Sequence, residues 1–337
     1  MILYVGNKLS KHGNTPTSVE TLGKLLSEEF QVVSVSDKKN KLFRSIDMVY
    51  SVIVYHEKAD FILIDTYSTL NFYYAFIVSI LANFFKVPYI PILHGGDLER
   101  RLMKSPKISR YIFENSHINI APSPYLETIY KKYGYRVVYI PNNLEINRYR
   151  FSPRKQVRPK LLYVRAFSRI YNPMMALKVL KKLSKKYSDA SLCMIGPDRD
   201  GTFDDIKKEA RRLGLENHVR LPGRLDKEEW WRLSEEYDIF INTTDYDNTP
   251  VSVMEAMALG LPVVSTNAGG LPYLLENRQD ALLVDVGDVA AMVQKISYLI
   301  DHPNEVERLT RNARAKVERF DWNAIKRNWI ELLRRER

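Results

Sequence analysis

The sequence predicts two doubly wound α/β domains. Short apolar runs alternate with longer helical patterns along nearly the whole chain, and these runs form two series of six. Runs that are apolar at almost every position are typical of a parallel sheet covered by helices on both faces. At 337 residues the chain is also too long for most single hydrophobic cores. Two series of strands in a chain of this length therefore favour two domains, each with its own sheet.

Each series lies on one side of a segment that lacks apolar periodicity. The expected strands of the first series are 2–6, 31–36, 61–65, 88–93, 117–121 and 137–140. Those of the second series are 160–165, 191–196, 218–222, 238–242, 262–266 and 281–285. The segment 141–159 between them is rich in Pro, Asn and Arg, so the domain joint is expected there. We predict an N-terminal domain over 1–150 and a C-terminal domain over 151–318.

Helix signals support this division. Thr17 with Glu20 fits a capping box at one expected helix start, and Asp226 with Glu229 fits a second. The last segment is expected to be an amphipathic helix that needs a partner surface. Its apolar residues recur at helical spacing: Trp322, Ile325, Trp329 and Leu332.

Composition narrows the partners. The net charge of +11 suits nucleotides, nucleic acid or an anionic membrane surface, although a solvated basic surface also explains it. No zinc knuckle or RNA-binding signature is present, so nucleic acid is not expected. The single cysteine, Cys193, excludes an internal disulfide, and no signal-peptide pattern is visible. The uncharged run 66–85 contains several polar residues, so it is interpreted as a buried helix. A cytoplasmic protein is expected, with peripheral binding to the inner face of the membrane as an extension.

Two acids, Asp247 and Glu255, stand eight positions apart around an expected helix start. The strand 238–242 runs into a loop that carries Asp247. Thr249 is a suitable N-cap for the helix that follows, and Pro250 suits its first position because proline has no N–H to leave unpaired. Glu255 then lies about one and a half turns along that helix.

This arrangement suits a ligand with a diphosphate at its centre. The N–H groups of Val251, Ser252 and Val253 are expected to point beyond the carboxyl edge of the sheet, where a helix end binds phosphate. Asp247 and Glu255 would accept hydrogen bonds from hydroxyls on either side, which matches the layout of a nucleotide sugar. On spacing alone, a turn-forming Asp247 and a surface Glu255 explain the same residues.

The run from Asp247 continues through Glu255 into AMALGLPVVSTNAGG. It resembles the signature of family-four glycosyltransferases with the GT-B fold, in which two acids with seven residues between them precede AMA-x-G-x-PVV and GG. Here the first acid is Asp rather than the usual Glu, so its carboxylate is one methylene shorter. The segments 88–97, 120–143 and 318–333 also match the family, so the resemblance covers nearly the whole chain.

The resemblance implies both a fold and a reaction. The fold is two Rossmann-like domains facing each other across a cleft, with the helix 319–337 packing back on the first domain. The reaction is retaining, metal-independent transfer of a sugar to an acceptor hydroxyl, with a UDP-, GDP- or ADP-linked sugar as donor and no cofactor. The acceptor would be a carbohydrate, a lipid or a small molecule. Asp247 would orient the sugar and Glu255 the ribose.

Further site residues are expected at the ends of strands. Gly13 and Asn14 lie in the loop after the first strand, where a glycine lets the backbone approach a phosphate. His94 ends another strand, and the matching residue in similar enzymes faces the acceptor and the reacting sugar. Gly196 ends a strand of the second domain near the expected position of the nucleotide base. Turn formation alone also explains the glycines.

The expected phosphate cations depart from the family pattern. Family members carry Gly-Arg and then Lys-Gly after the first strand of the second domain. Here Arg165 stands at the glycine position, Ala166 at the arginine position and Tyr171 at the lysine position. Arg165 and Arg169 are the nearby cations, and a guanidinium fork binds diphosphate oxygens well. We therefore expect both arginines to bind the diphosphate.

Three alternatives stay open at the level of sequence. The same fold serves nucleotide-sugar epimerases and sugar phosphorylases, although their additional carboxylates or cofactor lysine are not evident. A non-catalytic nucleotide-sugar-binding subunit is the third alternative, because the usual phosphate cations are replaced.

A basic cluster in the first domain also suits anionic lipid, and a solvated helix face explains it equally well. Its members are Arg100, Arg101, Lys104, Lys107 and Arg110.

Overall fold

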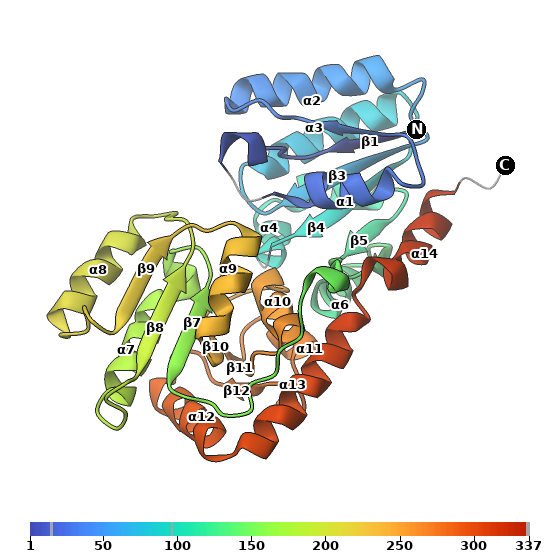
Figure 1. The fold of residues 1–337 in the computed structure, drawn as a ribbon. Coiled ribbons are helices and arrows are strands. Elements are labelled where there is room, and N and C mark those ends of the chain that lie inside the picture. Colours follow the sequence, from blue (N-terminus) through green and yellow to red (C-terminus); the bar gives the residue numbers. More distant parts are fainter. Residues whose placement is uncertain (14–15, 96, 335–337) are drawn as a thin grey trace. The chain divides into compact units, whose positions relative to one another are not determined.

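The computed structural model describes residues 1–13, 16–95 and 97–334. The chain divides into two compact units, coloured along the sequence in Figure 1. Unit 1 comprises Met1–Asn143 with Trp322–Arg337, and unit 2 comprises Leu144–Asp321. These limits differ by a few residues from the boundaries at 150/151 and 318/319 expected from the sequence.

Unit 1 contains a parallel sheet with the strand order β2-β1-β3-β4-β5-β6. Its strands are β1 (Ile2–Val5), β2 (Val32–Val35), β3 (Phe61–Tyr67), β4 (Tyr89–His94), β5 (Asn119–Ala121) and β6 (Val137–Tyr139). The pairing of β3 with β4 is the longest and runs from Ile62 opposite Tyr89 to Tyr67 opposite His94. The strand order reverses between β1 and β3, which is where an open sheet of this kind places a ligand.

Helices cover both faces of this sheet. They are α1 (Ser18–Leu26), α2 (Lys41–Tyr55), α3 (Asn71–Phe84), α4 (Leu98–Lys104), α5 (Pro106–Glu114), α6 (Pro124–Lys132) and α14 (Trp322–Leu333), with the 3-10 turn η1 (Ser10–His12). Alternate residues of β1 enter different cores, because neighbouring side chains of a strand point to opposite faces. Leu3 joins the core formed with α2 and α3, and Tyr4 joins the core formed with α1 and α14.

The last helix, α14, buries the apolar face that the sequence predicts. Trp322, Ile325 and Trp329 are buried in the same core as Ile2 and Tyr4. The helix begins at Trp322 rather than at 319. Its amphipathic pattern is therefore satisfied by the first sheet, although the residues that supply the pattern lie at the far end of the chain.

Unit 2 contains a second parallel sheet, with the order β12-β11-β10-β7-β8-β9. Its strands are β7 (Lys160–Val164), β8 (Ser191–Ile195), β9 (Val219–Gly223), β10 (Ile239–Asn242), β11 (Val263–Thr266) and β12 (Leu282–Val284). The strand order reverses between β7 and β10. The two series of six strands predicted from the sequence are thus confirmed, as is the parallel α/β class.

The helices of unit 2 connect these strands. They are α7 (Pro173–Leu183), α8 (Thr202–Arg212), α9 (Lys227–Leu233), α10 (Val251–Leu259), α11 (Leu271–Leu274), α12 (Val289–Asp301) and α13 (Pro303–Glu318). Short 3-10 turns are η2 (Ile146–Arg148), η3 (Arg169–Tyr171) and η4 (Ser234–Glu236). The capping boxes predicted at Thr17 and Asp226 are both present.

The uncharged run 66–85 contributes the end of β3 and then α3. Among the described residues, no helix combines the length and the apolar character needed to cross a bilayer.

Candidate functional site

The two strands at the reversal point of the second sheet bring two charged side chains together. Arg165 directly follows β7, and Asp247 lies in the loop after β10. Nη2 of Arg165 donates a hydrogen bond to Oδ2 of Asp247, and both side chains are largely buried. Loops from neighbouring strands leave in opposite directions at such a point, which opens a crevice for a ligand. The pair therefore lies where a doubly wound sheet binds its ligand.

Arg165 is also held by an aromatic ring. Its guanidinium carbon lies 4.3 Å from the centroid of the Tyr171 ring, a distance at which a cation is attracted to the ring face. Burial alone would lower the pKa of Arg165, but the neighbouring Asp247 carboxylate, together with Tyr171, raises it. The Nε–H of Arg165 is buried without an acceptor. Tyr171, which stands at the lysine position of the family pattern, thus supports the arginine that stands at the glycine position.

The start of α10 differs from the prediction. Thr249 was expected to cap the helix with Pro250 at its first position, but the helix begins at Val251 with Pro250 as the N-cap. The reason is the backbone of Pro250, whose ψ of 116° is extended rather than helical. The N–H of Val253 already donates to the Pro250 carbonyl at 3.1 Å, so it is not available as expected.

Two donors remain at this helix end. The N–H of Val253 donates to a carbonyl, whereas the N–H groups of Val251 and Ser252 donate no hydrogen bond within the described part of the chain. First-turn N–H groups have no partner within their own helix, and the helix dipole adds partial positive charge there. The end of α10 can therefore receive an anion.

Glu255 lies on α10 and is only 3% exposed. The hydroxyl of Tyr149 donates to its Oε1 at 3.0 Å, and Nζ of Lys227 lies 2.7 Å from the same oxygen. Burial, followed by the Glu255 charge, raises the pKa of Tyr149 well above its ordinary value. Glu255 is thus a buried carboxylate with a cationic partner, not a solvated helix residue.

Sequence reasoning missed both partners of Glu255. Lys227 is the first residue of α9, directly after the capping box at Asp226, and Tyr149 follows η2. The capping box locates the start of α9, but no local pattern links that start to α10. The signal that would find them is tertiary.

The two glycines that end the motif hold the Asp247 loop in place. The N–H of Gly270 donates to the Asp247 carbonyl at 2.8 Å. A Cβ at Gly269 would lie 2.2 Å from the Asp247 carbonyl oxygen, and one at Gly270 would lie 2.3 Å from the Asn248 carbonyl oxygen. Any side chain would therefore push the loop away, which explains the need for glycine at both positions.

The remaining sequence-predicted residues of unit 2 lie close to the same strand ends. A Cβ at Gly196 would stand 2.0 Å from the Arg165 carbonyl oxygen, so this glycine lets β8 approach the loop after β7. Arg169 is exposed at the start of η3, and its N–H donates to Oδ2 of Asp200 at 3.0 Å. Gly196 thus has a structural reason that does not involve a ligand.

A different cluster occupies the carboxyl edge of the first sheet. His94 ends β4, and its Nε2 lies 2.7 Å from Oδ1 of Asp65 on β3. The Tyr4 hydroxyl donates to the same oxygen at 2.9 Å, and the N–H of Val19 donates to Oδ2 at 3.3 Å. The ring of Tyr67 stacks on His94 with the centroids 5.0 Å apart. We call Tyr4, Asp65, Tyr67 and His94 the Asp65 cluster.

Asp65 is completely buried, whereas the side chain of His94 is 13% exposed. The carboxylate therefore holds the imidazole at Nε2, and part of the His94 side chain remains accessible. Burial, followed by the Asp65 charge, raises the pKa of Tyr4 well above its ordinary value, so this hydroxyl stays a donor. Asp65 was missed by sequence reasoning, and its signal was an acid at the end of the otherwise apolar run FILID.

One further predicted position, Gly13, lies in the loop that follows β1. Gly13 ends η1 with φ 78°, and its N–H donates to the Ser10 carbonyl at 2.9 Å. This left-handed conformation favours glycine and explains its presence. Asn14 lies outside the described residues. No group of three or more His, Cys, Asp and Glu side chains that could hold a metal ion occurs in the part of the chain that the structure describes.

The predicted basic cluster is divided between two helices. Arg101 lies on α4, where its Nε donates to the Ser68 carbonyl at 2.7 Å and its guanidinium lies over the Phe72 ring. Lys107 and Arg110 lie on α5, which begins after a break at Ser105. Arg101 therefore packs against the start of α3 instead of contributing to a solvated face.

Comparison with known proteins places the chain in a family. Residues 145–316 match the family described as Glycosyl transferases group 1. This match spans just over half of the chain and contains Arg165, Asp247 and Glu255. The chain belongs to the family of group 1 glycosyl transferases.

Curated relatives carry the same kind of description. The amylovoran biosynthesis glycosyltransferase AmsK of Erwinia amylovora is 29% identical over 202 residues, which are 54% of this chain and 50% of AmsK. The glycogen synthase of Mycobacterium tuberculosis (strain H37Rv) is 25% identical over 261 residues, which are 73% of this chain and 62% of the synthase. The aligned region thus spans less than two thirds of these relatives.

Solved structures match over nearly the whole chain. HepE of Anabaena in complex with UDP superposes with a TM-score of 0.79 at 19% identity, covering 98% of this chain and 99% of HepE. The sucrose-phosphate synthase of Thermosynechococcus elongatus gives a TM-score of 0.77 at 17% identity, covering 98% and 97%. The GT-B fold implied by the sequence resemblance is confirmed.

Proposed function

We propose that this protein transfers a sugar from a nucleotide diphosphate sugar to an acceptor hydroxyl, with retention of configuration and without a metal ion. The observation that carries the proposal is the meeting of Arg165, Asp247 and the start of α10 at the reversal point of the second sheet. The HepE structures, which contain UDP, UDP with glucose or UDP-glucose, support a UDP-linked donor as the first choice.

The diphosphate would occupy the end of α10. The N–H groups of Val251 and Ser252 would donate to its oxygens, and Arg165 would supply the positive charge. A guanidinium has five N–H donors, so Arg165 can keep its bond to Asp247 and still bind phosphate. The unpartnered Nε–H of Arg165 supports this role, because a ligand anion would satisfy it.

This arrangement supplies the electrostatic part of catalysis. Negative charge develops on the departing diphosphate as the sugar leaves, and fixed donors aimed at that charge lower the barrier. In the proposed reaction the helix end and Arg165 provide this stabilisation without a metal ion or an organic cofactor. Arg169 would add a second, exposed cation.

The two acids would hold the hydroxyls on either side. Asp247 would accept from the sugar, oriented by its bond to Arg165. Glu255 would accept from the ribose; both of its contacts with Lys227 and Tyr149 are made through Oε1. Gly196 would lie beside the base of the nucleotide. Gly13 would let the backbone of unit 1 approach the ligand closely.

His94 would hold the acceptor hydroxyl. Its Nε2 is engaged by Asp65, which leaves Nδ1 as the nitrogen for a ligand. Asp65 would act through His94 as a positioning residue, because its own oxygens are completely buried.

One observation favours a second candidate, a nucleotide-sugar-binding subunit without catalysis. Ala166 and Tyr171 replace the arginine and lysine of the family pattern, so this site has fewer cations than similar enzymes. A single arginine stacked on Tyr171 would then bind a diphosphate without stabilising its departure enough for turnover.

A thermal-shift series with UDP, GDP and ADP tests ligand binding first. A ligand that binds only the folded form raises the melting temperature, and we expect the largest rise with UDP. The control is Arg211→Ala, an exposed arginine of α8 that should respond as the parent does. No rise with any diphosphate would contradict the proposal.

Radiolabelled donors then separate the candidates. Transfer to an acceptor, or slow hydrolysis of one UDP-sugar, supports the transferase. Binding without turnover supports the subunit. Interconversion of the sugar while it stays linked to UDP would indicate an epimerase, and phosphate-dependent release of a sugar phosphate would indicate a phosphorylase.

A further inference from the structure

Helix α3 is apolar on its exposed side as well as on its buried side. It contains no charged residue over Asn71–Phe84. Phe72, Ala75 and Val78 are buried in the core, as expected for a helix that covers a sheet. The exposed apolar residues recur every three or four positions, so they form one stripe along the helix. They are Leu70, which precedes the helix, Tyr73, Ile77, Ile80 and Phe84, the last of them 76% exposed.

Helix α2 repeats this pattern. Met48 and Val52 are buried in the same core as the inner face of α3. The opposite side of α2 carries six exposed apolar residues that also fall in one stripe at 3.6 residues per turn. They are Leu42, Phe43, Ile46, Tyr50, Ile53 and Val54. A helix that covers a sheet is normally polar on its outer side, so both helices depart from the rule in the same way.

The two stripes lie on neighbouring helices. Helices α2 and α3 pack against each other on the same face of the first sheet (Figure 1). Together they expose more apolar side chains in one region than the scattered ones that are normal on the surface of a monomer. A large apolar patch of this kind marks an interaction site. We call the eleven exposed residues of the two stripes the α2–α3 surface.

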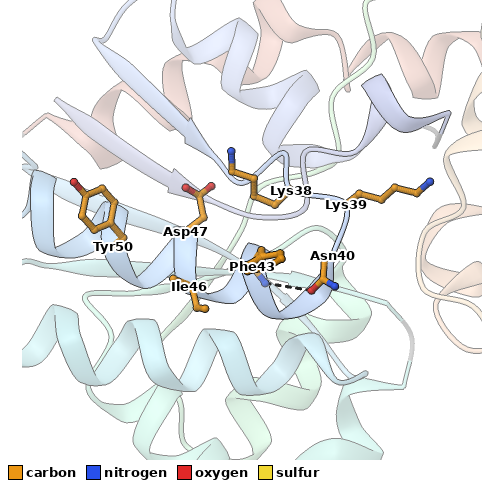
Figure 2. A pocket seen from close by; sticks show the side chains of 7 residues that line it. All are labelled: Lys38, Lys39, Asn40, Phe43, Ile46, Asp47 and Tyr50. Atoms are coloured by element: carbon orange, nitrogen blue, oxygen red, sulfur yellow. Dashed lines mark hydrogen bonds between the residues drawn. The ribbon is translucent and has the colours of Figure 1, made fainter.

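Lysines border this surface where α2 begins. Lys38 and Lys39 line a shallow cavity of about 370 Å³ together with Asn40, Phe43, Ile46, Asp47 and Tyr50. In Figure 2 the ammonium groups of Lys38 and Lys39 extend away from the cavity. Lys41 adds a third charge at the first position of the helix. The acid of the cavity, Asp47, accepts a hydrogen bond from Ser36, whereas Nζ of Lys38 lies 4.0 Å from Oδ1 of the partly exposed Asp37.

A cation also borders the other helix. The guanidinium of Arg101 lies 6.0 Å from the centroid of the Tyr73 ring. Arg100 and Lys104 are carried by the same short helix, α4, whose Met103 is 62% exposed. The apolar stripes are therefore flanked by basic residues on α4 and before α2.

We propose that the α2–α3 surface docks on an anionic lipid bilayer. Apolar and aromatic side chains bordered by lysines and arginines match the boundary between acyl chains and anionic headgroups, where the apolar part is buried and the cations meet phosphate. A two-fold contact of this face with a second copy of the chain is the competing occupant, and the test below distinguishes it. The proposal goes beyond the proposed sugar transfer and does not depend on it.

Vesicle flotation tests the proposal with the full chain. Vesicles of equal parts phosphatidylcholine and phosphatidylglycerol should carry the protein upward, whereas vesicles of phosphatidylcholine alone should bind it at least roughly tenfold more weakly. The triple variant Phe43→Gln, Ile46→Gln, Phe84→Gln should lower the partition coefficient by roughly tenfold or more. Its control is Val286→Gln with Tyr298→Gln, two exposed apolar residues of unit 2, which should bind as the parent does.

A second pair of variants removes three lysines either beside the α2–α3 surface or from unit 2. Lys38→Gln, Lys39→Gln, Lys41→Gln should lower binding to the anionic vesicles by roughly tenfold to a hundredfold. Lys182→Gln, Lys185→Gln, Lys208→Gln removes the same charge from exposed positions of unit 2 and should have little effect. Since all substituted side chains are exposed, unchanged melting temperatures check that the variants fold.

Three results would overturn the proposal. The first is equal binding of the parent to neutral and anionic vesicles. The second is parent-like binding by both the Phe43, Ile46, Phe84 variant and the Lys38, Lys39, Lys41 variant. The third is a concentration-dependent dimer in sedimentation equilibrium without vesicles that the Phe43, Ile46, Phe84 variant abolishes, which would assign the surface to a second copy of the chain.

Discussion

The carboxyl edges of the two sheets carry opposite chemistry on the same architecture. At the edge of the second sheet, Arg165 and the start of α10 present positive charge beside the buried carboxylate of Asp247. At the edge of the first sheet, the buried Asp65 holds His94 and Tyr4, and the cluster contains no arginine or lysine. The first arrangement suits a polyanion, and the second suits a hydroxyl that needs a hydrogen-bond partner.

The difference supports the proposed assignment of the donor to the second sheet. A parallel sheet offers a ligand position at its reversal point in both units, so topology alone does not distinguish them. The side chains do. Burial of a diphosphate is favourable only beside compensating positive charge, and Arg165 is a largely buried cation at the edge between β7 and β10. Substitutions at the two edges should therefore affect different steps.

The largest expected effect is that of Arg165→Ala. Loss of the guanidinium removes the charge that stabilises the departing diphosphate, so kcat/KM should fall by roughly a hundredfold to a thousandfold. Affinity for UDP and for inorganic pyrophosphate should fall together, because in the proposed complex Arg165 would contact the diphosphate that they share. Initial rates with a labelled donor and titration calorimetry measure both quantities. Arg211→Ala is the control, and an Arg165→Ala protein within twofold of it would break the comparison.

The next effect comes from the other edge. Asp65→Asn keeps the shape of the side chain but removes the charge that holds His94, so the transfer rate should fall by roughly a hundredfold. UDP affinity should stay unchanged, because the donor is assigned to unit 2. The split between turnover and binding, measured on one protein, distinguishes positioning from general damage. A parallel loss of UDP affinity would contradict the assignment of the two edges.

A smaller and more selective effect is expected from Glu255→Gln. If Glu255 binds the ribose, affinity for UDP should fall by about tenfold while affinity for pyrophosphate stays the same, since one hydrogen bond to a charged group contributes about 1.5–3 kcal/mol. Calorimetry with both ligands gives the ratio. The account would be wrong about Glu255 if neither affinity changed.

A stability effect is expected at the motif's glycines. Gly270→Ala places a Cβ 2.3 Å from the Asn248 carbonyl oxygen, so the Asp247 loop must move at a cost of about 1–3 kcal/mol. Gly134→Ala meets no atom within 4 Å and serves as the comparison, with strain only from its φ of 82°. Thermal unfolding should rank Gly270→Ala below Gly134→Ala, and UDP affinity should fall only in the former. The reverse ranking would contradict the packing argument.

The smallest effect concerns Asp200, which anchors the loop of Arg169. Hydrogen bonds from Thr202, the Arg169 N–H and Ser168 lower the pKa of Asp200 to about 2. A carboxyl whose folded pKa lies below its unfolded value contributes stability that is present above about pH 4 and is lost as the pH falls toward 2. Asp200→Asn should therefore lower the melting temperature slightly at pH 6 and not at pH 2. A pH-independent difference would rule out the charge as its cause.

The elements of the fold were predictable because their signals are local. An apolar run marks a buried strand, and Thr17 with Glu20 marks a helix start, whichever residues lie elsewhere in the chain. The start of α10 lies one residue later than predicted. The identity of Pro250 as proline does not determine that its backbone is extended. Arg165 and Asp247 could each be proposed as site residues because both follow strands of a doubly wound sheet.

The partners of the site residues were not predictable. Asp65 meets His94 because β3 pairs with β4 in a register that puts Tyr67 opposite His94. Lys227 meets Glu255 because α9 and α10 pack into the same core of unit 2. Neither contact produces a periodic pattern in the sequence. Each depends on strand register or helix packing, which cannot be read from a single sequence.

A crystal of the protein soaked with UDP tests whether the start of α10 binds the diphosphate. The account predicts diphosphate oxygens within hydrogen-bond distance of the N–H groups of Val251 and Ser252 and of the Arg165 guanidinium, with the ribose at Glu255. An empty helix end in a crystal whose soak reaches saturating UDP, or UDP bound elsewhere in the molecule, would contradict it.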